Sequence, residues 1–167
     1  LSGGTGRDRA MTGEAERQGR IWGARAAAWA EEEAAEAPKF EAVIARVGLA
    51  SGRAVLDVGC GSGVFLALAA GRGARVSGLD ASEALIAVAR GRVPDADLRI
   101  GDMSRLPFGD DAFAVVTGFN SFFLAPDMAA ALGEEVRDRL WLESRVAEAA
   151  AVTQSDPRQW RAAHATG

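Results

Sequence analysis

The residues best suited to binding chemistry lie in one stretch, residues 54–65. A short apolar run leads into Asp57, and Gly59, Gly61 and Gly63 then alternate with other residues before an Ala/Leu-rich segment. This order predicts a buried strand, a tight turn and the start of a helix. Glycine tolerates backbone angles that other residues avoid and lets a ligand approach closely, and a helix N-terminus offers free N–H groups. The stretch therefore has the layout of a nucleotide-binding site.

Two further acids follow later apolar segments. Asp80 comes after Gly63 at close to the roughly 20-residue spacing of a ribose-binding acid, and a carboxylate can accept both ribose hydroxyl protons. Asp102 follows the next strand-like segment in the sequence Gly-Asp-Met. A solvated acid at a strand end for Asp80, and a turn-forming aspartate for Asp102, are the structural alternatives.

The elements that must position these acids alternate between strand and helix. Apolar runs predict strands over residues 54–58, 75–79, 97–100 and 112–118. Between them lie predicted helices over residues 64–71 and 83–90, the second with Ser82 as its N-cap. Short loops between β and α segments indicate a parallel sheet covered by helices, with the strand order 3-2-1-4.

A helical extension precedes this α/β core. Alanine and glutamate predict a helix over residues 20–37, which Pro38 ends, and an apolar 3.6-residue period predicts a second one up to Gly48. Trp22 and Trp29 are seven residues apart and are expected on one helical face, where they either pack or cover the site. Residues 1–19 lack periodicity and are expected to be a disordered tail.

Composition narrows the class of protein. The 167 residues suit one domain, and the net charge of −4 argues against a general nucleic-acid binder. No apolar run reaches the ~20 residues of a membrane span. Cys60 is the only cysteine, so a disulfide within the chain is impossible and a cytoplasmic location is expected.

The string Val-Leu-Asp-Val-Gly-Cys-Gly-Ser-Gly, with its D-x-G-x-G-x-G spacing, resembles motif I of the class I S-adenosylmethionine-dependent methyltransferases. The dinucleotide pattern G-x-G-x-x-G is not met, because Val64 stands three residues after Gly61. Residues 101–108 and 112–116 are similar to the type 11 group, the ubiquinone/menaquinone-biosynthesis-like enzymes. The resemblance implies a Rossmann-like α/β fold and S-adenosyl-L-methionine as cofactor.

The resemblance also assigns roles to residues. Asp57 is placed near the cofactor's amino group, Asp80 on the ribose and Asp102 on the exocyclic amine of adenine. Ala81 is placed beside the adenine, the Met103 backbone at the ring edge, and Phe119, with Asn120, near the methyl-donating end. Packing in the core is the alternative for Phe119. The cofactor-binding set is Asp57, Gly59, Cys60, Gly61, Gly63, Asp80, Ala81, Asp102, Met103 and Phe119.

The resemblance ends near Leu132. Gly133 to Gly167 has no Pro-Gly-Gly turn and no strand-like run, so strands 5–7 of the full methyltransferase fold are expected to be missing through truncation or a frameshift. We expect a domain over residues 20–151 (a helical cap at 20–48, a core at 53–132 and a divergent helix at 127–151) and a polar tail over 152–167. Strand four would then be an exposed edge that favours self-association.

The predicted function is methyl transfer to an unidentified small-molecule acceptor, without nucleic-acid or membrane partners. Such transfer depends on positioning and desolvation, so no catalytic residue is assigned. His164, the only histidine, lies in the tail, and neither a metal site nor a catalytic role for Cys60 is expected. The alternatives are a non-catalytic module that binds S-adenosylmethionine and, disfavoured by the glycine spacing, a nicotinamide oxidoreductase.

Overall fold

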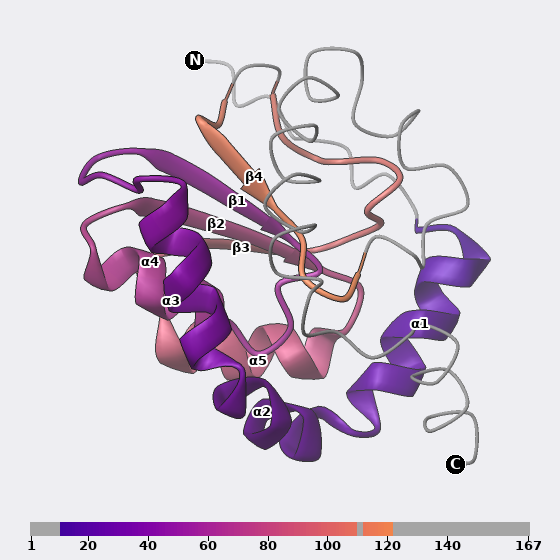
Figure 1. The fold of residues 1–167 in the computed structure, drawn as a ribbon. Coiled ribbons are helices and arrows are strands. Elements are labelled where there is room, and N and C mark those ends of the chain that lie inside the picture. The colour runs from indigo at the N-terminus through magenta and orange to yellow at the C-terminus, as the bar shows by residue number, and fades with distance from the viewer. Residues whose placement is uncertain (1–10, 110–111, 122–167) are drawn as a thin grey trace.

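A computed structural model describes residues 11–109 and 112–121 of the chain, and the statements below concern these residues. Four strands form a parallel sheet: β1 (Ala54–Val58), β2 (Arg75–Asp80), β3 (Asp97–Ile100) and β4 (Val115–Thr117). Their order is β3-β2-β1-β4 (Figure 1), which confirms the predicted order. The chain runs outward from β1 to β3 and then returns to the other side of β1, so a topological switch point lies between β1 and β4.

The register of the sheet sets the positions of the candidate acids. Asp57 is paired with Gly78 on one side and with Thr117 on the other, and Val58 is paired with Leu79. Asp80 is paired with Ile100 at the end of β3. The turn that follows β1 therefore lies beside the end of β2, which brings Asp80 next to the glycines.

Helices cover one face of the sheet. The helix α4 (Val64–Gly71) connects β1 to β2, α5 (Glu83–Arg92) connects β2 to β3, and α3 (Ala37–Arg46) packs against α4 (Figure 1). Phe65, Leu66 and Ile86 fill the layer between helices and sheet and are almost fully buried. Burying one such side chain contributes roughly 1.5–3 kcal/mol, and this layer fixes the helices against the strands.

The opposite face of the sheet has its own apolar cluster. Leu56, Val58, Leu79 and Val116 are buried there. The partly buried side chains packed against them are Met103, Leu106, Phe108 and Phe113. The loop that leads from β3 to β4 thus covers the second face of the sheet.

The chain begins its described part with a helix where a tail was expected. The helix α1 (Gly13–Gly23) has Thr12 as its N-cap, whose hydroxyl accepts a hydrogen bond from the Ala15 N–H at 3.3 Å. The prediction of a disordered tail was therefore wrong for residues 13–19. Tertiary contact explains the difference: α1 packs on α5, and at Gly19 an added side chain would overlap the carbonyl of Ala81.

The single helix predicted over residues 20–37 is also wrong. The helical conformation is interrupted at Ala24 and Arg25, so α1 is followed by a separate helix α2 (Ala26–Ala35). Trp22 and Trp29 therefore lie on different helices, with their rings edge to face and the centroids 4.9 Å apart. This contact between apolar rings joins α1 and α2 into one helical cap.

Smaller differences concern the ends of elements. Pro38 does not end the preceding helix, because α2 already stops at Ala35, and it lies in the first turn of α3, where a missing N–H is tolerated. The helix α5 continues to Arg92, two residues beyond the prediction. Only three residues of the segment 112–118 pair with β1, so β4 is shorter than expected.

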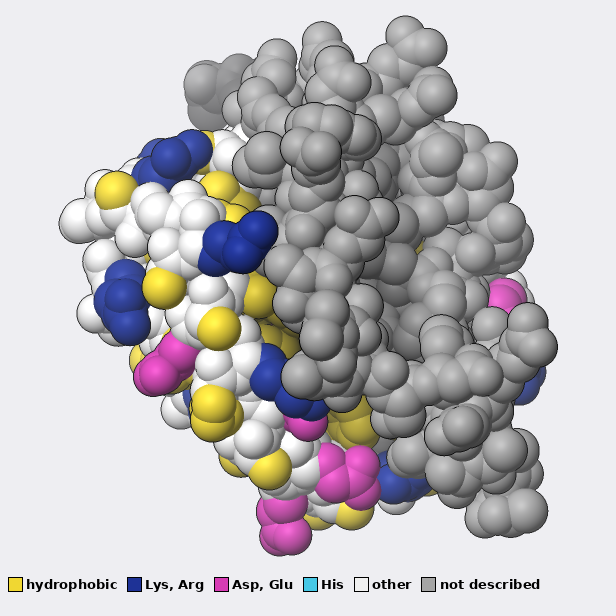
Figure 2. All heavy atoms as spheres, viewed as in Figure 1, with side chains coloured by type: hydrophobic (Ala, Val, Ile, Leu, Met, Phe, Trp, Pro, Cys, Tyr) yellow, Lys and Arg dark blue, Asp and Glu magenta, His cyan; other side chains and the backbone are white. Residues whose placement is uncertain are grey.

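The visible surface of the described residues carries mixed charge. In Figure 2 the basic side chains stand apart from one another, and acidic side chains gather around α2 at the lower end of the molecule. No helix in residues 11–109 and 112–121 is long and apolar enough to cross a membrane. The helix expected over 127–151, the polar tail and the missing strands lie outside the described residues.

Candidate functional site

The turn after β1 needs glycine at three alternate positions. Gly59, Gly61 and Gly63 have φ angles of 76°, 54° and 80°, in the left-handed region that favours glycine. An added methyl group at Gly59 would overlap the Cβ of Ser121, and one at Gly63 would come within 3.0 Å of the Ala89 Cβ. The glycines thus serve both backbone geometry and close packing.

The backbone N–H groups of residues 59–63 all have acceptors inside the chain. Two donate to the Leu79 carbonyl at 2.7 and 3.0 Å, and the last stays within the turn. Gly61 N–H donates to Oδ2 of Asp80 at 3.0 Å, and Ser62 N–H donates to Oε2 of Glu33 at 2.7 Å. A pyrophosphate would meet two carboxylates here instead of free N–H groups, so the turn does not suit a dinucleotide.

Asp80 stands at the end of β2 between the turn and α5. Its Oδ1 accepts a hydrogen bond from the Ser82 N–H at 2.8 Å, while Oδ2 accepts from Gly61. Burial raises its pKa from 3.8 to about 6, against the opposing effect of the backbone hydrogen bonds from Ser82 and Gly61. Each oxygen keeps a lone pair for a further donor, so the carboxylate can bind two adjacent hydroxyl groups.

Asp57 lies behind the turn. Its side chain is buried, and its Oδ1 accepts a hydrogen bond from the Thr117 hydroxyl at 2.8 Å. Burial raises its pKa from 3.8 to about 7, the Thr117 hydrogen bond opposes this rise, and the charges of Glu33 and Asp80 add to it. Asp57 thus connects β1 to β4 and adds negative charge beneath the turn.

The raised pKa of Asp57 predicts the pH dependence of stability. The unfolded carboxyl titrates near 3.9 and the folded one at about 7, so between these values the folded state binds more protons than the unfolded state. The free energy of unfolding therefore falls as pH rises through this window. We expect a lower thermal unfolding midpoint at pH 8 than at pH 5, and a smaller difference in Asp57→Asn; equal differences in both proteins would contradict this account.

Asp102, after β3, is bound by the start of α1. Its Oδ2 accepts hydrogen bonds from the Thr12 N–H at 3.1 Å and the Thr12 hydroxyl at 2.6 Å, and its Oδ1 accepts from the N–H and hydroxyl of Ser104. Burial alone would raise the pKa of Asp102, but these hydrogen bonds outweigh it and lower the pKa to about 2. With four donors the carboxylate has little capacity for an adenine amine, and it holds the cap onto the sheet.

A pocket opens at the carboxyl ends of β1, β2 and β4, under the cap. It is lined by Gln18, Trp22, Trp29, Gly59, Gly61, Leu79, Asp80, Ala81, Leu85, Gly101, Met103, Phe119, Asn120 and Ser121. Its volume is about 60 Å³. Six of the predicted cofactor-binding residues are thus brought together: Gly59, Gly61, Asp80, Ala81, Met103 and Phe119.

The other four predicted residues do not line the pocket. Asp57 and Asp102 are tied to Thr117 and Thr12 as described, and Gly63 is the N-cap of α4, facing α5. Cys60 is buried, and a side chain at Gly78 would come within 2.8 Å of its sulfur. Burial raises the pKa of the Cys60 thiol well above 9.0, so the thiol is no nucleophile at neutral pH.

A second, wider hollow lies at the opposite end of the strands. Ala54, Arg75 and Asp97, the first residues of β1, β2 and β3, lie along it. None of the predicted site residues lines this hollow. Ligands of open α/β sheets bind at the carboxyl ends of the strands, so the pocket under the cap is the candidate site.

Sequence reasoning missed Glu33. The run Glu31-Glu32-Glu33 reads as a solvated helix face, yet Glu33 is buried against the turn while its two neighbours are exposed. The available signal was its position four residues after Trp29, which places both side chains on one face of α2. Trp29 lines the pocket, and both Trp29 and Glu33 lie against Gly61 of the turn.

Comparisons with known proteins agree with this geometry. A family model described as a methyltransferase domain matches residues 55–140, just over half of the chain. The demethylmenaquinone methyltransferase of Renibacterium salmoninarum is 40% identical over 75 residues, 45% of this chain and 32% of that protein. The methyltransferase GfsG of Streptomyces halstedii is 35% identical over 104 residues, 58% of this chain and 37% of that protein.

A solved structure has the same architecture. The TehB-like S-adenosylmethionine-dependent methyltransferase from Corynebacterium glutamicum superposes with a TM-score of 0.53 at 26% sequence identity, over 63% of this chain and 61% of that one. The fold and the site define a Rossmann-like binding domain, and the chain belongs to the methyltransferase domain family. The matches span only about a third of the length of the two curated relatives.

Proposed function

We propose that this chain binds S-adenosyl-L-methionine in the pocket under the cap and acts in methyl transfer to a small-molecule acceptor. The observation that carries the proposal is the arrangement of Asp80 against the glycine turn. The Asp80 carboxylate faces the pocket at the end of β2. The carboxylates of Asp80 and Glu33 accept the hydrogen bonds of the Gly61 and Ser62 N–H groups, which a phosphate would need. A phosphate-free adenosine fits this arrangement better than a dinucleotide.

Different residues around the pocket would contact different parts of the cofactor. The Asp80 carboxylate would accept the ribose hydroxyl protons, and Ala81 and Met103 would flank the adenine. Gly59 and Gly61 would present their backbone, rather than a side chain, to the cofactor. Phe119 and Asn120, after β4, would lie at the methyl-donating end.

The pocket is smaller than the proposed cofactor needs. A volume of about 60 Å³ is well below the roughly 300–1,000 Å³ of small-molecule sites. Trp22, Trp29 and Gln18 from α1 and α2 form the pocket's cap side. Entry of the cofactor therefore requires these cap-side chains to shift away from the glycine turn.

The bound cofactor would supply an electrophilic methyl group on a sulfonium. Asp80, Ala81 and Met103 would hold the cofactor so that its methyl could pass to the acceptor's nucleophilic atom, with the acceptor's proton released to solvent. The residues of the chain orient the two reactants and exclude water, which is sufficient for such a displacement. Among the residues lining the pocket, the one titratable side chain is Asp80, whose assigned role is binding.

Calorimetry with S-adenosylhomocysteine tests the proposal directly. We expect binding with a 1:1 stoichiometry, and no competition by NADH. Transfer of a labelled methyl group to any of a panel of phenols, carboxylic acids and quinols would establish turnover. Tight binding without transfer to any acceptor would favour the non-catalytic module instead. Absence of S-adenosylhomocysteine binding by the folded chain would overturn the proposal.

A further inference from the structure

Glu33 is the acidic residue of the cap that reaches the glycine turn. It is 7% exposed, and its Oε2 accepts hydrogen bonds from the N–H and the hydroxyl of Ser62, both at 2.7 Å. A methyl group built at Gly61 would lie 2.8 Å from the same oxygen. Gly61 lines the pocket and Glu33 does not, so the Glu33 carboxylate lies just beyond the lining, against Gly61.

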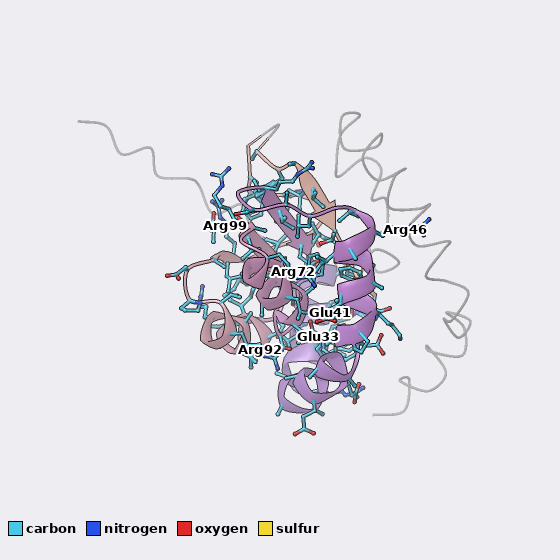
Figure 3. All side chains as sticks on the ribbon, turned by 60° about the vertical axis from the view of Figure 1, so that its left-hand side comes forward. Glu33, Glu41, Arg46, Arg72, Arg92 and Arg99 are labelled. Atoms are coloured by element: carbon cyan, nitrogen blue, oxygen red, sulfur yellow. The ribbon has the colours of Figure 1, made fainter. Side chains whose placement is uncertain are left out.

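Two further carboxyl groups lie close enough to Glu33 to interact with its charge. Asp57, from β1, and Asp80, from β2, both interact electrostatically with it. The opposing cation is Arg92 of α5, which lies beside Glu33 in Figure 3. Its guanidinium donates to the carbonyl of Ser62 at 3.2 Å, to the Ser62 hydroxyl and to the carbonyl of Ala30 at 3.3 Å. In this part of the described chain, three carboxyl groups interact with one another, and one guanidinium faces Glu33.

A buried carboxylate requires compensation, because removing it from water is costly. Burial raises the pKa of Glu33, and the hydrogen bonds from Ser62 and the charge of Arg92 only partly oppose this. The N-terminus of α4 contributes a further partial positive charge. Among the described residues, no three acidic, histidine or cysteine side chains are arranged to hold a metal ion. A cationic group on a ligand would add to the compensation that Ser62 and Arg92 provide.

We propose that Glu33 is a binding residue for the α-ammonium group at the amino-acid end of the methyl donor, an inference that rests on the function proposed above. A helix N-terminus ordinarily attracts a ligand's carboxylate, but at α4 Glu33 already occupies that position. The amino-acid end is therefore oriented with its ammonium group toward α2. Gly61 lets Glu33 lie against the turn at the edge of the pocket, since a side chain there would overlap its carboxylate.

A role limited to capping α4 leads to a different expectation. A glutamine at position 33 can still accept the Ser62 hydrogen bonds through its amide oxygen. The N-terminal capping of α4 would therefore be retained. It would lose the charge that recognises an ammonium group. The experiment must therefore compare ligands that differ only in this group.

Calorimetry with two ligands makes this comparison: S-adenosylhomocysteine, and 5′-S-(3-carboxypropyl)-5′-thioadenosine, which lacks only the amino group. We expect the unaltered chain to bind the first about tenfold or more tightly than the second, as for a hydrogen bond between charged groups. In Glu33→Gln this preference should fall to about threefold or less. Glu31→Gln, a change at an exposed position on the same helix, should keep it.

Each outcome decides the question. Equal binding of both ligands by the unaltered chain would overturn the assignment of Glu33. This test needs no variant, so it holds even if Glu33→Gln does not fold. An equal loss of affinity for both ligands in Glu33→Gln would assign Glu33 to capping alone. Failure of the unaltered chain to bind S-adenosylhomocysteine would overturn the proposed function itself, and with it the role of Glu33.

Discussion

Replacing Asp80 with alanine is expected to weaken S-adenosylhomocysteine binding by about 100-fold or more. Hydrogen bonds to a charged group contribute roughly 1.5–3 kcal/mol each, and the carboxylate is assigned two ribose hydroxyls. The same change frees the N–H groups of Gly61 and Ser82, which now donate to Asp80 at 3.0 and 2.8 Å. Both effects act on the pocket, because Gly61 and Asp80 line it together. Calorimetry measures the loss of affinity.

Two matched variants separate recognition from folding. Asp95→Ala changes an exposed acid in the loop before β3 and should leave binding unaltered. Asp80→Asn keeps the size of the side chain and one acceptor oxygen, and we expect affinity between that of Asp80→Ala and the unaltered chain. Thermal unfolding identifies any variant that loses its fold. Affinity of a folded Asp80→Ala protein within about threefold of the unaltered chain would remove Asp80 from the site.

Replacing Gly59 with alanine is expected to lower the free energy of unfolding by about 2–5 kcal/mol. A side chain at a φ of 76° costs roughly 1–2 kcal/mol. Overlap of the new methyl group with the Cβ of Ser121 adds about 1–3 kcal/mol, as for other overpacked positions. Ser121 cannot move away easily, because it is buried and its hydroxyl donates to the Val58 carbonyl at 2.7 Å. Chemical denaturation measures the change.

Gly52 provides the control for this substitution. Its φ is 79°, almost the same as at Gly59, but a methyl group built there has no neighbour within 4 Å. Gly52→Ala should therefore show the backbone cost alone, about 1–2 kcal/mol. We expect the difference between the two variants to equal the cost of the overlap at Ser121. Equal destabilisation by both would show that the turn tolerates a side chain at Gly59 once the φ cost is met.

The sequence alone determined the central part of the fold. The bounds predicted for β1, β3 and α4 agree with the structure, and Ser82 caps α5 through a hydrogen bond from the Leu85 N–H at 3.2 Å. These elements have strong local signals: unbroken apolar runs, glycines at left-handed positions and an N-cap serine. Asp80 could be placed in the site for the same reason, since it ends a strand whose position in a parallel sheet is fixed by the alternating pattern.

Only the tertiary structure decided how the cap meets the core. The helices α1 and α2 both pack against α5, a contact between segments distant in sequence. Asp102 has the local sequence of a ligand-binding acid, yet Thr12, distant in sequence, takes its Oδ2. Glu33 has the local sequence of a solvated face, yet it is buried at the turn. A carboxylate's role depends on which donors the fold brings to it, and those donors come from elements far apart in the chain.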